Sequence, residues 1–168
     1  MLKKNLANII TITRIVGTIV LLPLETLSNA FYVVYTYCGF SDVLDGFVAR
    51  KLKIISDFGS KLDSASDITF YTVMMIKILP YLKKLLPKYI WILIYSVLFI
   101  RFLCYVYVHR TRNEFESRHT IYNKLTGFLM FLLPFLLNQQ YFIYYCMLVL
   151  LVAYIATVDE IIYMLNNK

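Results

Sequence analysis

The chain has 168 residues, of which 60% are hydrophobic and 16% are charged, and its mean hydropathy is +0.67. An ordinary soluble domain carries fewer apolar and more charged residues. The net charge of +7 could suggest a nucleic-acid partner, but the sequence has no RNA-binding motif and no soluble basic face, so we expect none. The composition predicts an integral membrane protein whose positive charge lies in loops that face anionic lipid.

Apolar stretches recur along the whole chain and predict an all-α fold of six transmembrane helices. Crossing a bilayer takes about 20 residues per helix, so the length allows six helices with short loops. We expect a single domain over residues 1–168. The predicted spans are 6–26, 29–51, 58–80, 87–109, 119–138 and 140–164. Pro23, Pro80 and Pro87 are expected at span ends, where a missing amide donor does little harm, and Pro134 inside the fifth span.

Lysine and arginine residues predict the orientation of the six spans. Those that flank the spans on one side are Lys3, Lys4, Arg50, Lys51, Lys53, Lys61, Arg110, Arg112, Arg118 and Lys168. The positive-inside rule assigns this side to the cytoplasm, so both termini are expected there. Lys83, Lys84 and Lys88 fall on the opposite side and do not follow the rule.

Residues 41–67 hold five of the six aspartates. Asp42 and Asp45 are i,i+3 neighbours near the end of the second span, and Asp63 and Asp67 are i,i+4 neighbours in the third. A short basic loop turns the chain back between the spans, so the two carboxylate pairs are expected to face each other. An acidic side chain near the bilayer centre costs about 2.5–3.5 kcal/mol, and four together would repel one another. We therefore expect cations to neutralise them and water to reach them.

Oxygen ligands in a charged cluster suit magnesium or manganese (Mg²⁺ or Mn²⁺) rather than zinc. Two such ions could share the four aspartates, and a carboxylate-bound pair of ions typically clamps a diphosphate and stabilises its leaving group. Gly46 and Ala49 continue the acidic face of the second span and leave room for a ligand. The alternative is that these small residues only allow the helices to pack closely.

The pattern Asp42-x2-Asp45-Gly46-x2-Ala49-Arg50-x8-Gly59-x3-Asp63-x3-Asp67 resembles the complete signature of the CDP-alcohol phosphatidyltransferase family. The segment ANIITITR also resembles the family's entry to its first helix through Asn8, Thr11 and Arg14, although Ala7 replaces the usual proline. NKLTGF at 123–128 resembles a lysine-threonine segment of the family's fifth helix. The resemblance extends over nearly the whole chain, but only the signature is highly specific.

The resemblance implies transfer of a phosphatidyl group from CDP-diacylglycerol to a small polar alcohol, with release of CMP. The bias toward Lys, Ile, Asn and Tyr indicates an AT-rich genome, so we expect a bacterial cell membrane, and the positive-inside rule predicts a site that faces the cytoplasm. The resemblance also implies a homodimer. Its implied metal ligands are Asp42, Asp45, Asp63 and Asp67, with Asp67 also the general base. Its implied nucleotide-pocket residues are Gly46, Ala49, Arg50 and Gly59.

Three further cations are expected in the layer of the aspartates, about 9–15 Å from the basic ends of their helices. Arg14, Arg101 and Lys124 could pair with the aspartates or bind an anionic acceptor or the donor phosphates. Glycerol 3-phosphate is the favoured acceptor, as in phosphatidylglycerophosphate synthases. Phe102 stands where those enzymes often have an acidic residue after the arginine, so inositol, inositol phosphate and serine stay open, as does a soluble CDP-alcohol donor with diacylglycerol as acceptor.

Other classes of protein could also place carboxylates in a membrane. A prenyltransferase binds diphosphate through magnesium and aspartates, but it spaces its acidic motifs differently and needs a longer chain. An ion transporter would need a path open to both sides, whereas the predicted acidic residues lie near one side. A membrane scaffold without catalytic activity would not need all the residues of the signature. Release of CMP would separate the transferase from the transporter and the scaffold.

Overall fold

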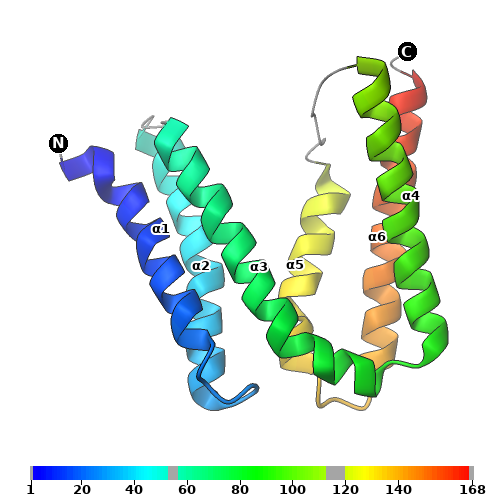
Figure 1. The fold of residues 1–168 in the computed structure, drawn as a ribbon, viewed down its shortest axis with the longest axis horizontal. Coiled ribbons are helices and arrows are strands. Elements are labelled where there is room, and N and C mark those ends of the chain that lie inside the picture. Colours follow the sequence, from blue (N-terminus) through cyan, green and yellow to red (C-terminus); the bar gives the residue numbers. More distant parts are fainter. Residues whose placement is uncertain (1, 53–56, 113–119, 167–168) are drawn as a thin grey trace. The chain divides into compact units, whose positions relative to one another are not determined.

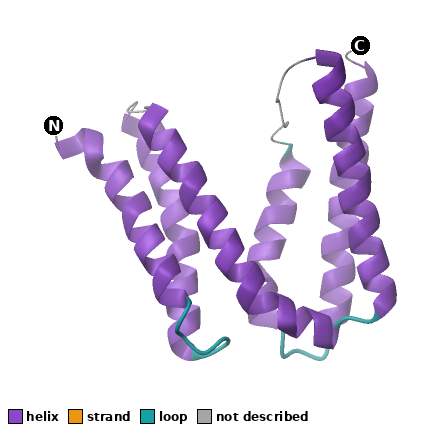
Figure 2. Cartoon of the chain, viewed as in Figure 1, coloured by secondary structure: helices purple, strands orange, loops and turns teal. Residues whose placement is uncertain are grey.

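The computed structural model describes residues 2–52, 57–112 and 120–166, and these residues form six α-helices and no strand (Figures 1 and 2). The helices are α1 (Leu2–Leu21), α2 (Asn29–Leu52), α3 (Asp57–Leu85), α4 (Lys88–Arg112), α5 (Ile121–Leu136) and α6 (Phe142–Asn166). Each overlaps one predicted span, so the all-α prediction is confirmed. The chain divides into two compact units, Met1–Leu82 and Lys83–Lys168.

The largest differences from the predicted helix boundaries are at the C-terminal ends of α1 and α3. α1 ends at Leu21 rather than near residue 26, and the loop that follows contains Leu27 with a φ of 70°. α3 continues to Leu85, so Pro80 lies inside the helix and not at its end. A proline within a helix removes one backbone hydrogen bond, and the surrounding residues can maintain the helix despite this loss. Pro134 lies inside α5, as predicted.

Two helices are long and apolar enough to cross a membrane, at Lys88–Tyr107 in α4 and Phe142–Tyr163 in α6. Only 11% and 33% of their apolar windows are buried within the chain, so they do not resemble the buried core helix of a soluble protein. Asn8–Leu21 and Ile121–Leu136 are shorter apolar helices. A full set of six membrane spans, with both termini in the cytoplasm, stays a prediction.

In the first unit, α1 packs against α2 along one face of each helix. Thr11, Arg14, Thr18 and Leu21 are buried, and their spacing of three, four and three residues places them on one side of α1. Gly17 lies on the same contact: a Cβ atom added there would come within 2.9 Å of the Cys38 Sγ. The glycine therefore permits the close approach of the two helices.

Aromatic stacking joins α3 to α2, and one lysine of α3 bonds to the loop that follows α1. The Tyr35 ring of α2 stacks on Phe70 of α3 with centroids 5.7 Å apart, and also on Phe31 at 5.8 Å. Nearer the other end of α3, the Lys77 Nζ donates a 2.6 Å hydrogen bond to the Leu24 carbonyl. The loop after α1 is thus tied to α3, and the three helices form one packed group.

In the second unit, α6 packs against both α4 and α5. The Tyr145 hydroxyl of α6 donates a 2.6 Å hydrogen bond to the Leu129 carbonyl of α5, and Tyr154 bonds with Ser96 of α4. α5 begins with a side-chain cap, because the Thr120 hydroxyl accepts a 3.2 Å hydrogen bond from the Asn123 amide. These contacts hold α6 between its two neighbours.

Candidate active site

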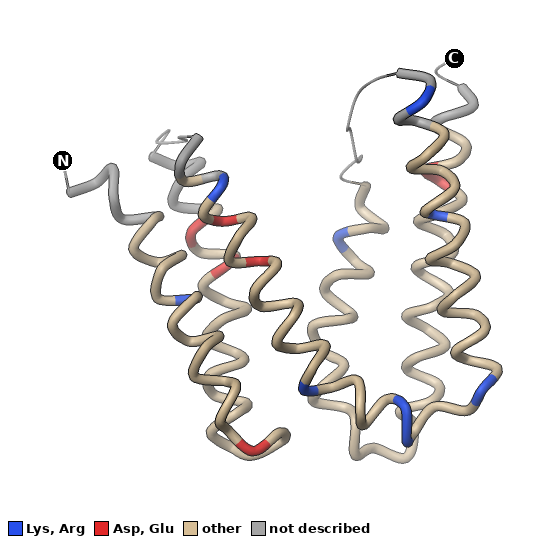
Figure 3. Tube along the Cα trace, viewed as in Figure 1, with Lys and Arg blue, Asp and Glu red and all other residues tan. Residues whose placement is uncertain are grey.

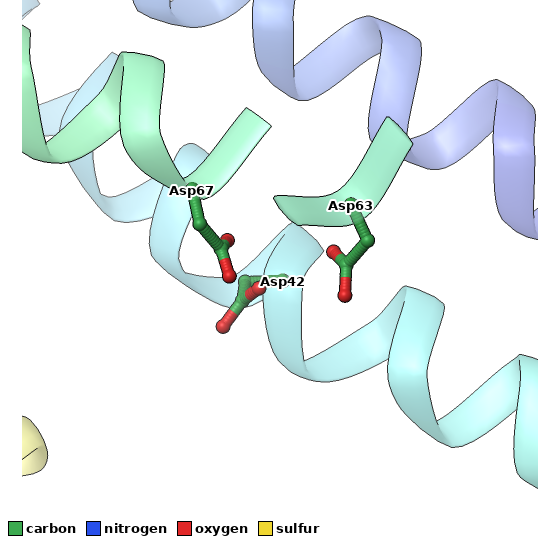
Figure 4. A group of neighbouring side chains, drawn as sticks. All are labelled: Asp42, Asp63 and Asp67. Carbon is green, nitrogen blue, oxygen red and sulfur yellow. The ribbon is translucent and has the colours of Figure 1, made fainter. Parts of the chain in front are cut away.

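Three carboxylates from two helices come together in the first unit. Asp42 of α2 and Asp63 and Asp67 of α3 each offer an oxygen, and these oxygens lie within 4.8 Å of one another. Figure 4 shows the three side chains, Asp42 extending from α2 and Asp63 and Asp67 from α3. The prediction that carboxylates of the two spans face each other holds for these three residues.

Asp45 lies deeper and points to a different neighbour. Its side chain is 5% exposed, whereas those of Asp42, Asp63 and Asp67 are between 44% and 52% exposed. The Thr11 hydroxyl of α1 donates a 2.9 Å hydrogen bond to the Asp45 Oδ2. The cluster therefore has an open side, formed by three carboxylates, and a closed side, where Asp45 meets α1.

Arg14 of α1 lies among all four aspartates. Its side chain is 1% exposed, and its Nη2 donates to the Asp63 Oδ1 at 2.6 Å and lies 3.2 Å from the Asp67 Oδ1. Its Nη1 pairs with Asp42 and lies 3.7 Å from the Asp45 Oδ2. Figure 3 shows a blue position in α1 beside the red positions of α2 and α3. Arg14 is thus a shared counter-ion of the two acidic helices.

The formal charges leave the cluster strongly acidic even with Arg14 in place. Four ionised carboxylates carry −4 and one guanidinium carries +1, which gives a formal sum of −3. Like charges at this spacing repel, and burial increases the cost. Three half-exposed carboxylates on the open side are also reachable from outside. The donor set consists only of oxygen, which matches the ligands of Mg²⁺ and Mn²⁺, so the residues fit a divalent ion.

Ser66 is a polar residue of the site that sequence reasoning missed. It is fully buried, and its Oγ accepts a 2.7 Å hydrogen bond from the Arg14 Nε. Ser66 follows Asp63 by three residues, so it lies on the acidic face of α3. The sequence does show a small polar residue three positions after Asp63, which could have indicated a site residue. Serine is, however, also common on helix surfaces that contact other helices.

The four residues predicted to line the nucleotide pocket lie on α2 and α3. Gly46 on α2 and Gly59 on α3 are partly buried. Ala49 and Arg50 belong to the last turns of α2, and their side chains lie outside the described residues. The nucleotide pocket expected of these four positions stays a prediction.

Arg101 and Lys124 belong to the second unit. The Arg101 Nε donates to the Thr157 hydroxyl at 3.0 Å, and its Nη2 donates to the Asn123 Oδ1 at 2.8 Å. Arg101 thereby links α4 to α5 and α6. Lys124 is exposed on α5. Their predicted contacts with an acceptor or a phosphate stay predictions.

The chain is similar to one protein family and to several known proteins. A family model described as CDP-alcohol phosphatidyltransferase matches residues 4–158. A CDP-diacylglycerol–serine O-phosphatidyltransferase of Methanocaldococcus jannaschii is 41% identical over 71 residues, which is 41% of this chain and 35% of that protein. CDP-diacylglycerol–glycerol-3-phosphate 3-phosphatidyltransferases of Rickettsia typhi and Rickettsia prowazekii are each 29% identical over 82 residues.

The two Rickettsia matches cover 44% of this chain and 46% and 45% of the relatives. The matched segments thus span less than half the length of each of these relatives. No solved structure matches the chain.

Proposed function

Because the chain belongs to the CDP-alcohol phosphatidyltransferase family, we propose that it transfers a phosphatidyl group from CDP-diacylglycerol to a small polar alcohol and releases CMP. The observation that carries this proposal is the meeting of Asp42, Asp63 and Asp67 beside Arg14. The three aspartates are three of the four acidic positions in the pattern that resembles the family signature. A cluster of this kind suits chemistry on a diphosphate, whose negative charge needs cations.

The aspartates are the proposed metal ligands, with Asp42, Asp63 and Asp67 on the open side and Asp45 behind them. The formal charge of the cluster supports up to two divalent ions. When bound, such ions shield the diphosphate and stabilise the departing phosphate oxygen. The oxygen-only donor set supports Mg²⁺ or Mn²⁺ as the cofactor.

Asp67 is the proposed general base. Its carboxylate is 44% exposed and therefore reachable by an alcohol. In the proposed step, Asp67 takes the proton of the acceptor hydroxyl while the oxygen attacks the phosphorus that carries the diacylglycerol. The phosphorus–oxygen bond to CMP breaks, and CMP leaves with the electron pair. A base must first be within reach of the proton that it removes, and the open side of the cluster supports this.

Arg14 has a proposed role as the counter-ion that allows the acidic helices to pack. Its four ion pairs and its 1% exposure support pairing with the aspartates rather than contact with an acceptor. Gly46, Ala49, Arg50 and Gly59 are proposed to contact the cytidine nucleotide, on the strength of the signature.

Glycerol 3-phosphate is the proposed acceptor, with Arg101 and Lys124 as candidates to bind its phosphate. The two Rickettsia relatives are named for this acceptor. Serine is the second candidate, because the relative with the higher identity is named for it. Inositol and inositol phosphate are the further acceptors to be tested. Arg101 already donates to Thr157 and Asn123, so it would bind an acceptor with its remaining donors.

The proposed setting is a bilayer, with six spans, both termini and the acidic site on the cytoplasmic side, and a homodimer as the assembly. The two apolar helices support a membrane location. The Rickettsia relatives support a bacterial cell membrane.

The test is release of labelled CMP from CDP-diacylglycerol by purified protein with Mn²⁺ or Mg²⁺. Glycerol 3-phosphate, serine, inositol and inositol phosphate are added one at a time. Release that depends on one acceptor supports the proposal and identifies the product. No release with any acceptor, and none from a soluble CDP-alcohol with diacylglycerol, would reject it in favour of an ion transporter or a scaffold.

A further inference from the structure

A basic and aromatic pocket lies in the second unit, at the turn between the last residues of α3 and the start of α4. It has a volume of about 270 Å³ and is lined by Lys83, Lys88, Trp91 and Tyr95. Lys88, Trp91 and Tyr95 follow one another at intervals of three and four residues, which places them on one face of α4. Lys84 is exposed next to the pocket but does not line it.

The turn that carries this pocket is firmly held. Leu86 is 7% exposed and Ile90 is fully buried, and the Ile90 amide donates a 3.1 Å hydrogen bond to the Pro87 carbonyl. The backbone that carries Lys88 is thus packed within the unit. Lys83 and Lys88 line the same pocket, so one anion there can accept hydrogen bonds from both ammonium groups.

The pocket coincides with one end of an apolar stretch. The membrane-length segment of α4 begins at Lys88 and runs to Tyr107. Tryptophan and tyrosine favour the depth of the lipid headgroups, and lysine near a helix end extends its ammonium group to the same level. Trp91 and Tyr95 lie within the first two turns of the segment, and Lys83 lies before it. All the lining residues are thus of the types that membranes place at the headgroup layer.

The positive charge at the α3–α4 turn is not neutralised by ion pairs within the described residues. Among the described residues, no carboxylate forms an ion pair with Lys83, Lys84 or Lys88. The described acidic residues of the unit are Asp159 and Glu160, which lie on α6 just after Thr157. Thr157 accepts a hydrogen bond from Arg101, and Arg101 lies thirteen residues, or about 20 Å, beyond Lys88 along α4. The two carboxylates therefore lie far from the lysines of the turn. Figure 3 shows the same separation, with the α3–α4 turn blue and the red segment of α6 toward its other end.

We propose that Lys83, Lys88, Trp91 and Tyr95 bind the phosphate headgroup of an anionic phospholipid. The two ammonium groups donate to the phosphate oxygens, while the rings pack beside the glycerol and the first methylenes of the chains. An anionic lipid fits because its phosphate lies at the headgroup depth that tryptophan, tyrosine and lysine near a helix end favour. The same binding explains why Lys83 and Lys88 occupy a loop that the positive-inside rule would keep free of lysine.

Trp91 is the only tryptophan of the chain, so its fluorescence reports on this pocket alone. The full chain is reconstituted into phosphatidylcholine vesicles that contain a small, fixed fraction of lipid with brominated acyl chains. The brominated lipid is phosphatidylglycerol in one series and phosphatidylcholine in the other. Bromine quenches a tryptophan that it approaches closely. We expect stronger quenching by the brominated phosphatidylglycerol, and a difference that shrinks as salt is added.

Variants of single lysines distinguish lipid binding in the pocket from general electrostatic attraction to the membrane surface. Lys83→Gln and Lys88→Gln are each expected to lower the preference for phosphatidylglycerol by about five-fold. Lys84→Gln removes the same charge beside the pocket and is expected to have a much smaller effect. Lys61→Gln, on the exposed early part of α3, is expected to have none.

Three results would overturn the proposal. Equal quenching by both brominated lipids would show no preference for an anionic lipid. An equal loss in Lys84→Gln and Lys83→Gln would show general surface attraction in place of a pocket. Displacement of the lipid by millimolar inorganic phosphate would show a site for a free anion. The assay measures no transfer, so its outcome is independent of the proposed enzymatic activity.

Discussion

The Arg14 Nε donates a 2.7 Å hydrogen bond to the Oγ of Ser66, a residue 52 positions later in the chain. Both side chains are buried, at 1% and 0% exposure. With the Nε held by Ser66, the two Nη atoms of the planar guanidinium face the carboxylates of α2 and α3. The serine thus orients the cation that the acidic helices share.

Replacing Arg14 with glutamine should destabilise the protein. The change leaves four carboxylates without their counter-ion, and removal of one partner from a buried ion pair costs about 3–5 kcal/mol. We expect the low end, because three of the carboxylates are about half exposed. Thermal unfolding in detergent with a chelator measures the loss, and added Mn²⁺ should recover part of it. Arg110→Gln, at an exposed position of α4, is the control, and an equal effect of both variants would contradict the assignment.

Replacing Ser66 with alanine should cost about 1–3 kcal/mol, because the buried Arg14 Nε loses its acceptor. The expected loss is smaller than that of Arg14→Gln, since the ion pairs remain. Ser64→Ala changes an exposed serine on the same helix and should change the unfolding temperature little. A double variant of Arg14 and Ser66 should be no less stable than Arg14→Gln alone, whereas additive losses would show that the two residues act separately.

Replacing Asp67 with asparagine should lower CMP release by at least about 100-fold, since general base catalysis contributes about 10²–10⁴ to a rate. The variant should stay folded and still bind CDP-diacylglycerol, because asparagine has nearly the same size. Turnover with labelled donor and binding to the same donor are measured side by side. Asp159→Asn, in α6, is the matched control. Near-normal turnover of the Asp67 variant would remove this residue from the role of base.

Removal of divalent ions should stop CMP release and lower the unfolding temperature, because the acidic cluster keeps a formal charge of −3 with Arg14 alone. Both properties should return with Mn²⁺ or Mg²⁺. The stability change should disappear when Asp42, Asp63 and Asp67 are all replaced by asparagine. A chelator effect of the same size in that triple variant would place the ion elsewhere.

Replacing Gly17 with alanine should destabilise the contact between α1 and α2. The new methyl group would lie 2.9 Å from the Cys38 Sγ, and insertion into a packed interface costs about 1–3 kcal/mol. Cys38→Ala in the same chain removes the clash and should restore part of the stability. Gly127→Ala is the control, since no atom lies within 4 Å of a Cβ added there. Failure of Cys38→Ala to improve Gly17→Ala would mean that the cost arises elsewhere.

The sequence predicted those features that depend on spacing along one helix. The apolar stretches marked six helices within a few residues, and the intervals of three and four residues grouped Asp42 with Asp45 and Asp63 with Asp67. Features that depend on contacts between helices were not determined in this way. The sequence left Arg14 between two roles and did not reveal Ser66, because both depend on how α1 meets α3. The position of Pro80 inside α3 was also missed, since a proline at the end of a span and one within a longer helix have the same local sequence.

The order of the helices along the chain has a consequence for biogenesis. The shared cation lies on α1 and the four carboxylates lie on α2 and α3, so the ribosome makes Arg14 first. N-terminal segments generally fold first during synthesis. In the proposed six-span arrangement, each acidic helix would meet its counter-charge as it enters the bilayer. If the order were reversed, two helices with four uncompensated carboxylates would be made before the residue that neutralises them.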